Sequence, residues 1–256
     1  MIHPTAIIHP RAELAADVTV GAYSVIGEKV RIGPGTAIGD HVSISGRTTI
    51  GARNHIHSFC ALGGIPQDKK YHGEDTALEI GDDNTIREFC TFNIGTSDDV
   101  GVTRLGNHNW IMAYVHLAHD CQVGSHTTFA NHATLAGHVR VDDWVILGGF
   151  VGVHQFVQIG AHSFLGISAV ITQDVPPYVM VAGHPAAPHG INSEGLRRRG
   201  FGAEEIAAIK QAYRKLYRSS LSLEEARNAL AQIAQESPCV QPMLDFLARS
   251  TRGIVR

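Results

Sequence analysis

The sequence predicts a mainly β fold, a parallel β-helix of hexapeptide repeats followed by a small α-helical C-terminal domain. An aliphatic residue recurs at every sixth position from Ile8 to Leu62, and the same period runs again from Leu105 to Ile171. A period of six fits neither a helix nor an alternating strand. It is typical of coils in which each repeat makes one short strand and one turn, with three repeats closing a coil of about 18 residues.

Two interruptions break the period. The first, around residues 65–77, is polar, and the second adds one residue to two repeats between Phe92 and Leu105. Loops that interrupt a regular solenoid are favoured places for binding residues. The repeat is expected to end at Pro176 and Pro177, because proline cannot donate a hydrogen bond to a strand ladder.

Three helices are expected after the repeats. Residues 203–218 place apolar side chains on one helical face, Ser222 begins a capping box that opens a second helix, and a third begins near Pro242. The predicted domains are therefore the β-helix of residues 1–183 and the helical domain of residues 184–256.

Composition limits the classes of partner and compartment. The chain has 256 residues and a formal net charge of -3, which argues against a nucleic-acid partner. No apolar run approaches 18 residues and the N-terminus lacks a signal pattern, so we expect no membrane insertion. Four cysteines without CxxC spacing indicate free thiols of a cytoplasmic protein.

Histidines are concentrated in one part of the repeat: six of the 16 fall between residues 116 and 154. Counting one coil of 18 residues from His119 gives Gly137, and a second gives Gln155, so these three are expected to stack on one outer face. By the same count Asp120 and His138 stack in the adjacent column.

This cluster suits acid–base chemistry. An imidazole beside a carboxylate is a candidate general base, because the carboxylate fixes the tautomer of the ring. A glycine lets a ligand approach its backbone N–H closely, which suits the stabilisation of an oxyanion. His116 and His154 flank the same face. Any single outward histidine of a solenoid can also be part of a solvated surface, but histidines aligned over three coils favour a site.

Several motifs resemble one family. HLAHDC at 116–121, LAGHV at 135–139, HQF at 154–156, GINSEGLRRRG at 190–200 and the terminal RSTRG resemble the cytoplasmic UDP-N-acetylglucosamine acyltransferases that begin lipid A synthesis. The resemblance covers nearly the whole chain. It implies a left-handed coil, a homotrimer with active sites between subunits, and no metal or dissociable cofactor. The implied reaction moves a 3-hydroxyacyl group from acyl carrier protein to the 3-hydroxyl of the sugar.

The resemblance also implies roles for individual residues. His119 matches the catalytic base, Asp120 its orienting carboxylate, and Gly137 the backbone donor to the oxyanion. The matched substrate-binding residues are His116, His138, His154 and Gln155 at the sugar and acyl donor, Gln67, Asp68 and Lys70 in the first interruption, and Asn192, Glu194, Arg198 and Arg199 at the nucleotide.

Ile167 matches the position that limits acyl-chain length. A bulky side chain there would close the groove, so a chain of about ten to twelve carbons is expected. The sequence departs from many relatives at Asn93 and Ile94, where a His-Arg pair is common, so contacts assigned to that pair do not carry over.

Three alternatives stay open on the sequence. A trimeric metalloenzyme of γ-carbonic anhydrase type shares the fold, but its H-x4-H pair is not completed because residue 159 is Ile. The sister N-acyltransferase normally carries an additional N-terminal domain, whereas repeats here begin by Ile8. A scaffold without catalytic activity is the third.

Overall fold

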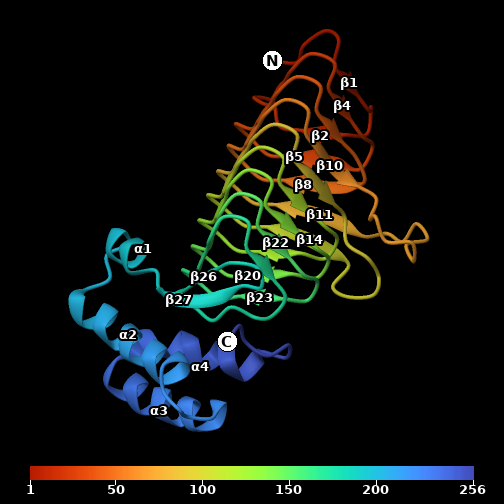
Figure 1. Ribbon diagram of the computed structural model, residues 1–256. Coiled ribbons are helices and arrows are strands. Elements are labelled where there is room, and N and C mark those ends of the chain that lie inside the picture. The colour runs from red at the N-terminus through yellow and green to blue at the C-terminus, as the bar shows by residue number, and fades with distance from the viewer.

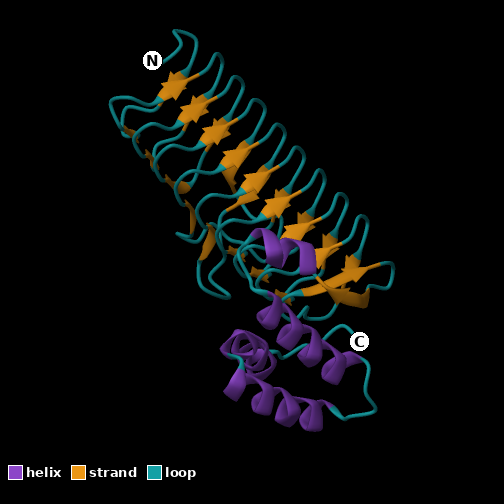
Figure 2. Cartoon of the chain, turned by 90° about the vertical axis from the view of Figure 1, so that its left-hand side faces the viewer, coloured by secondary structure: helices purple, strands orange, loops and turns teal.

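The computed structural model covers residues 1–256 and has the predicted architecture, a left-handed parallel β-helix followed by helices (Figure 1). Three sheets form the sides of a prism, and successive strands along the chain enter different sheets. Figure 2 shows the strands of one sheet stacked in a row along the prism. Within each sheet the strands stack in the order of the coils, so the prism grows by one layer with every third repeat.

The strand bounds are these. The first sheet contains β1 (Ile7–Ile8), β4 (Val25–Ile26), β7 (Ser43–Ile44), β10 (Ala61–Gly64), β13 (Thr91–Asn93), β16 (His116–Leu117), β19 (Thr134–Leu135), β22 (Gly152–Val153) and β25 (Val170–Ile171). The second contains β2 (Glu13–Leu14), β5 (Val30–Ile32), β8 (Arg47–Ile50), β11 (Ala77–Ile80), β14 (Val102–Leu105), β17 (Gln122–Val123), β20 (Arg140–Val141) and β23 (Gln158–Ile159). The third contains β3 (Thr19–Val20), β6 (Ala37–Ile38), β9 (His55–Ile56), β12 (Thr85–Ile86), β15 (Trp110–Ile111), β18 (Thr128–Phe129), β21 (Ile146–Leu147), β24 (Phe164–Leu165), β26 (Val179–Ala182) and β27 (Ala187–Ile191).

The inward residue of each short strand builds the core. Leu117 lies in register with Leu135, and Leu135 with Val153, each pair separated by one coil of 18 residues. All three are almost fully buried. Stacking aliphatic side chains in columns removes apolar surface from water, which is the main favourable term for this fold.

Turns between the strands place side chains outward from an unusual backbone. Eighteen non-glycine residues have positive φ, among them Asp120 (61°) and His138 (64°). Such a conformation is costly for a residue with a Cβ. Stacking between coils offsets part of that cost: the ring of Tyr114 lies 4.8 Å from that of Phe89 and 4.7 Å from that of His132, nearly parallel to both.

Both predicted interruptions leave the coil as loops. They comprise residues 65–76, between β10 and β11, and residues 94–101, between β13 and β14. The second sheet nevertheless stays in register across them, since Ile50 pairs with Ile80 and Ile80 with Leu105. The two loops project from the same side of the prism, whereas α1 (Ser193–Arg198) lies on the opposite side (Figure 1).

The C-terminal region differs in part from expectation. The repeat does not end at Pro176 and Pro177, because β26 follows them and pairs in parallel with β24. Both prolines lie in the turn before the strand, so neither has to donate a hydrogen bond to the ladder. The antiparallel β27 then closes a hairpin with β26 that crosses the expected boundary at residues 183 and 184. That boundary between folding units stays a prediction.

The three predicted helices are present as α2 (Ala203–Tyr217), α3 (Leu223–Glu236) and α4 (Gln241–Arg249), with a 3₁₀ turn η1 (Pro238–Val240) before α4. The capping box at Ser222 is confirmed, because its backbone N–H donates to Glu225 and its hydroxyl accepts from the Glu225 N–H. The short α1 was not expected. None of the helices combines the length and apolar character needed to span a membrane, and all four cysteines are free thiols.

Candidate active site

The site is built on two consecutive turns between the first and second sheets. His119 and Asp120 follow β16, and Gly137 and His138 follow β19 one coil later. The His138 backbone N–H donates to the His119 carbonyl at 3.0 Å, which fixes the two turns in the register that the 18-residue count predicted.

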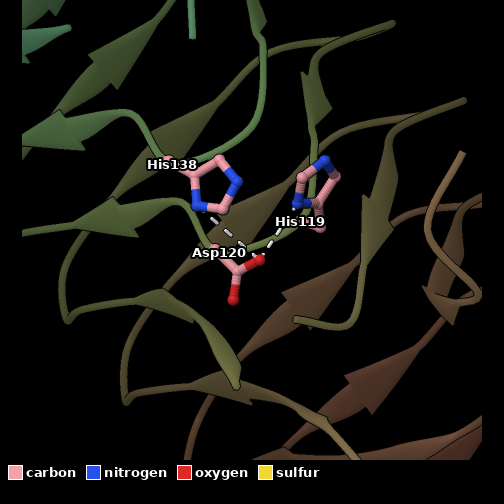
Figure 3. Close-up of side chains that lie close together, drawn as sticks. All are labelled: His119, Asp120 and His138. Atoms are coloured by element: carbon pink, nitrogen blue, oxygen red, sulfur yellow. Dashed lines mark hydrogen bonds and ion pairs between the residues drawn. The ribbon is translucent and has the colours of Figure 1, made fainter. Parts of the chain in front are cut away.

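Asp120 connects two imidazoles (Figure 3). Its Oδ2 lies 3.0 Å from His119 Nδ1 and 3.9 Å from His138 Nδ1. The His119 ring meets the His138 ring edge to face, with 4.9 Å between their centroids. Because an ionised carboxylate only accepts hydrogen bonds, neutral His119 carries its proton on Nδ1 and leaves the lone pair of Nε2 free.

The carboxylate of Asp120 is fully buried, so its charge depends on hydrogen bonds. The Thr96 hydroxyl donates to Oδ2 at 2.6 Å, and the Thr96 backbone N–H lies 3.0 Å from the same oxygen. Burial alone would raise the pKa of Asp120, but the hydrogen bonds from His119 and Thr96 outweigh it and hold the pKa below its ordinary value. Asp120 is therefore a charged partner for the imidazole at neutral pH.

Gly137 lies directly against the ring of His119. A Cβ added to Gly137 would lie 2.5 Å from His119 Cε1 and 2.7 Å from Nε2, so any larger residue would displace the ring. The Gly137 N–H donates to no acceptor within the chain. The free base nitrogen and an unused backbone donor thus occupy neighbouring positions.

Other predicted residues surround this centre. His116 bonds the Thr91 hydroxyl at 2.8 Å, and burial, together with the charge of His119, lowers the pKa of its ring. His154 and Gln155 occupy the next turn along the prism, where Phe156 stacks on His138 at 4.3 Å. These positions agree with the coil count.

The first loop also reaches the centre. Lys70 pairs with Asp98 at 3.1 Å and with Asp68 at 3.7 Å. The Lys70 backbone N–H, followed by the charges of Lys70 and His119, lowers the pKa of Asp68. Gln67 lies in the same loop and has no hydrogen bond through its side chain. The Asp68 carboxylate is therefore close enough to His119 for the charges of the two side chains to interact.

The predicted nucleotide-binding residues lie apart from this centre within one chain. Asn192 caps α1 by accepting from the Gly195 N–H, and Arg198 pairs with Glu194 at 3.1 Å. Arg199 lies over the Trp144 ring and donates to His162 at 3.3 Å. Burial, followed by the Arg199 charge, lowers the pKa of His162 to about 4, so that ring is a neutral acceptor at neutral pH.

Ile167 is 72% exposed and precedes Ser168 in the turn between the third and first sheets. His119 belongs to the turn between the first and second sheets. One chain therefore presents the two residues at different corners of the prism, as the separation of two and two-thirds coils predicted.

The same side chains offer ligand atoms that a metal could use, since one atom each from His119, Asp120 and His138 lies within 4.8 Å of the others. However, Asp120 Oδ2 already receives the Thr96 hydroxyl and N–H as well as His119. The donor set is thus arranged for a hydrogen-bonded base, with little free lone-pair capacity for an ion.

The sequence did not indicate Thr96 or Asp99, both in the second loop. Asp99 lies 3.0 Å from His138 Nδ1. The unusual Asn93 is also explained: it is nearly buried, and its amide donates to the Ile65 carbonyl at 2.9 Å, fixing the start of the first loop. A closer look at Gly95-Thr96, which directly follow Asn93 and Ile94, could have found Thr96, whereas nothing in the sequence marks Asp99.

A hexapeptide β-helix with a carboxylate–imidazole pair and a free N–H on its outer face has the architecture of the hexapeptide transferases. A family model described as "Bacterial transferase hexapeptide (six repeats)" matches residues 103–137. Another, described as "Udp N-acetylglucosamine O-acyltransferase; Domain 2", matches residues 174–255.

Full-length relatives identify the family. The chain is 65% identical over 255 residues to the Acyl-[acyl-carrier-protein]--UDP-N-acetylglucosamine O-acyltransferase of Thiobacillus denitrificans, covering 100% of this chain and 99% of that protein. Among solved structures, LpxA from Acinetobacter baumannii is similar with a TM-score of 0.97 and 45% identity, covering 100% and 99%. The Francisella novicida UDP-N-acetylglucosamine acyltransferase has a TM-score of 0.98 and 43% identity, covering 100% and 94%. The chain belongs to the UDP-N-acetylglucosamine O-acyltransferase family.

Replacing Thr96 with Val should make stability less dependent on pH. The lowered pKa of Asp120 contributes stability above the ordinary aspartate value of about 3.9, and this contribution is lost as the pH falls through the lower folded value. Without the Thr96 hydroxyl the folded pKa rises, so the variant should be less stable than wild type by about 1.5–3 kcal/mol at neutral pH. The difference in the free energy of unfolding between the variant and wild type should narrow below about pH 4.

Thermal unfolding between neutral pH and acid would check this. Thr96→Ser keeps the hydroxyl and should follow wild type. A gap between Thr96→Val and wild type that stays constant with pH would contradict the assigned role of the hydroxyl.

Proposed function

We propose that the chain transfers a 3-hydroxyacyl group from acyl carrier protein to the 3-hydroxyl of UDP-N-acetylglucosamine, the first step of lipid A biosynthesis. The relatives are named for this donor and acceptor, and their names favour acyl transfer over the metalloenzyme alternative. The observation that carries the mechanism is the His119 ring, which is held by Asp120 and lies against Gly137, a residue whose N–H is free.

The chemistry follows from these three groups. His119 Nε2 removes the proton from the sugar hydroxyl, and the oxygen forms a bond to the thioester carbonyl carbon. The carbonyl oxygen becomes negatively charged and accepts a hydrogen bond from the Gly137 N–H. As the carbon–sulfur bond breaks, the imidazolium returns its proton to the leaving thiolate. The buried Asp120 stabilises the imidazolium between the two proton transfers.

The surrounding residues would bind the two substrates. His116, His138, His154 and Gln155 line the face next to the base, while Gln67, Asp68 and Lys70 border it from the first loop. Arg198 and Arg199, with Asn192 and Glu194, would receive the nucleotide, because guanidinium groups suit phosphate oxygens. The reaction uses a soluble carrier and a nucleotide sugar, which supports a cytoplasmic location.

A homotrimer would complete the site. Within one chain, α1 and the loops that border His119 lie on opposite sides of the prism (Figure 1). The principal hollows of a single chain, including one of about 690 Å³ over the second sheet, are not lined by His119. A neighbouring subunit would supply both the second wall and the nucleotide-binding helix.

An acyltransfer assay with 3-hydroxyacyl carrier protein and UDP-N-acetylglucosamine tests the proposal directly. His119→Ala should lower kcat by about 100- to 10 000-fold or more, since it removes the general base. Replacing the exposed His55 with Ala is the matched control and should leave the rate near wild type. More than half of the wild-type rate in His119→Ala, with normal circular dichroism, would contradict the assignment.

Mixed trimers test whether two subunits share a site. His119→Ala and Arg198→Ala should each be nearly inactive at low nucleotide-sugar concentration, whereas co-expressed chains should regain up to about a quarter of wild-type activity. Random assembly gives an intact pair of half-sites at about one site in four. Activity no higher than that of the separate variants, in trimers verified by mass, would place both residues in one chain's site.

Ile167→Gly should lengthen the preferred acyl chain. If the exposed Ile167 closes the far end of the groove, wild type should favour about ten to twelve carbons, and each additional covered methylene in the variant should gain about 0.8 kcal/mol. Competition between donors of about ten to about fourteen carbons measures the optimum. An unchanged optimum would leave Ile167 as a packing residue only; Ile167→Val, a smaller change, should shift it less.

A further inference from the structure

The site contains a second carboxylate–imidazole pair. Asp99, in the second loop, lies 3.0 Å from His138 Nδ1 through its Oδ2. The alternative partner for this nitrogen, Asp120 Oδ2, is 3.9 Å away and outside hydrogen-bond distance. The hydrogen bond to Asp99 is therefore the one that determines where the proton of the His138 ring resides.

The ring itself has little freedom. Its side chain is 9% exposed, Phe156 stacks on one face at 4.3 Å with 5° between the planes, and His119 meets it nearly at a right angle. Packing thus fixes the plane of the His138 ring but not its tautomer, because aromatic contacts do not distinguish the two nitrogens. Only a polar partner can make that choice.

The loop that carries Asp99 is held by the three residues that precede it. Thr96 donates its hydroxyl to Asp120 at 2.6 Å, and Asp98 pairs with Lys70 at 3.1 Å. Ser97 also reaches Glu74 in the first loop at 3.5 Å. These contacts hold the Asp99 carboxylate over His138 although the side chain of Asp99 remains 29% exposed.

We propose that Asp99 is a positioning residue that holds neutral His138 with its proton on Nδ1, so that Nε2 accepts a hydrogen bond from a hydroxyl of the bound substrate. This inference rests on the proposed function, in which the sugar nucleotide carries several hydroxyl groups and the acyl chain carries one. A carboxylate accepts but does not donate, so Nδ1 must donate to it. Nε2 then presents a lone pair, and a substrate lacking the matching donor leaves it unpaired.

The Asp99–His138 pair would have a different role from the Asp120–His119 pair. Asp120 acts on His119, whose Nε2 takes the proton of the attacking hydroxyl. Asp99 acts on His138, which in this assignment stays neutral and orients the substrate. Neither proton of the reaction passes through Asp99, so its removal should weaken substrate positioning and leave the base intact.

A double-mutant cycle measures whether Asp99 acts through His138. In the wild-type background Asp99→Ala should lower kcat/KM by about 10- to 100-fold, the effect expected for a hydrogen bond with a charged partner. In the His138→Ala background the same change should cost no more than about twofold, because the group that Asp99 positions is already absent. An equal cost in both backgrounds would overturn the proposal.

The control is Asp75→Ala in the first loop. Asp75 is an exposed aspartate that contacts Lys29 and Arg47 and no histidine, so this change should leave kcat/KM within about twofold of wild type. A loss as large as that of Asp99→Ala would indicate a general effect of loop charge and overturn the assignment to His138.

Ring ¹⁵N spectra of histidine-labelled protein provide a readout independent of activity. The His138 signals are those missing from His138→Ala. Wild type should give a protonated Nδ1 and an unprotonated Nε2, and Asp99→Ala should shift protons toward Nε2. An unchanged spectrum would reject the tautomer assignment even if the variant were slow, and failure of the wild-type assay would reject the proposed function while leaving the spectrum interpretable.

Discussion

The stacking of coils 18 residues apart is the constraint on which this molecule depends. Each short strand forms its hydrogen bonds with strands one coil before and after it, and the inward side chain of one coil rests on that of the next. A strand of two residues has no stability alone, so every position is fixed by its neighbours along the prism. The same constraint brings His119 beside Gly137 and Asp120 beside His138, because each pair differs by one coil.

The turns between the strands carry the outward side chains that form the candidate site. A residue at positive φ points its side chain outward along the corner, and such residues on successive coils stack on one another. At most corners the result is a column of aromatic rings, whose contacts offset part of the backbone cost. The column of Asp120 and His138 differs because its carboxylate and its imidazole both lie beside the ring of His119. The scaffold thus supplies the rigid spacing that catalytic groups require.

The arithmetic of the repeat explains how much could be predicted from the sequence. Leu117, Leu135 and Val153 marked the inward positions, and from them the count gave the fold, the turns and the juxtaposition of His119, Asp120, Gly137 and His138. The count fails where the chain leaves the coil. Thr96 and Asp99 lie in a loop whose closure depends on contacts with the other loop. Likewise, β26 and β27 follow a proline pair that ends the repeat pattern in the sequence but not the third sheet.

One of the interruptions also supplies hydrogen bonds that stabilise the buried charge of Asp120. The regular coil supplies His119 and Asp120, and His119 donates one hydrogen bond to the buried carboxylate, but the other donors to it come from a loop. The loop of residues 94–101 brings the Thr96 hydroxyl and N–H to that carboxylate. It also brings Asp99 to His138, which lies two coils beyond β13, the strand that precedes the loop. A continuous repeat would place the same histidines in the same columns without either hydrogen bond. The repeat therefore fixes where the catalytic groups lie and which nitrogen of His119 bonds Asp120, and the loop that departs from it adds the Thr96 donors to Asp120 and brings Asp99 to Nδ1 of His138.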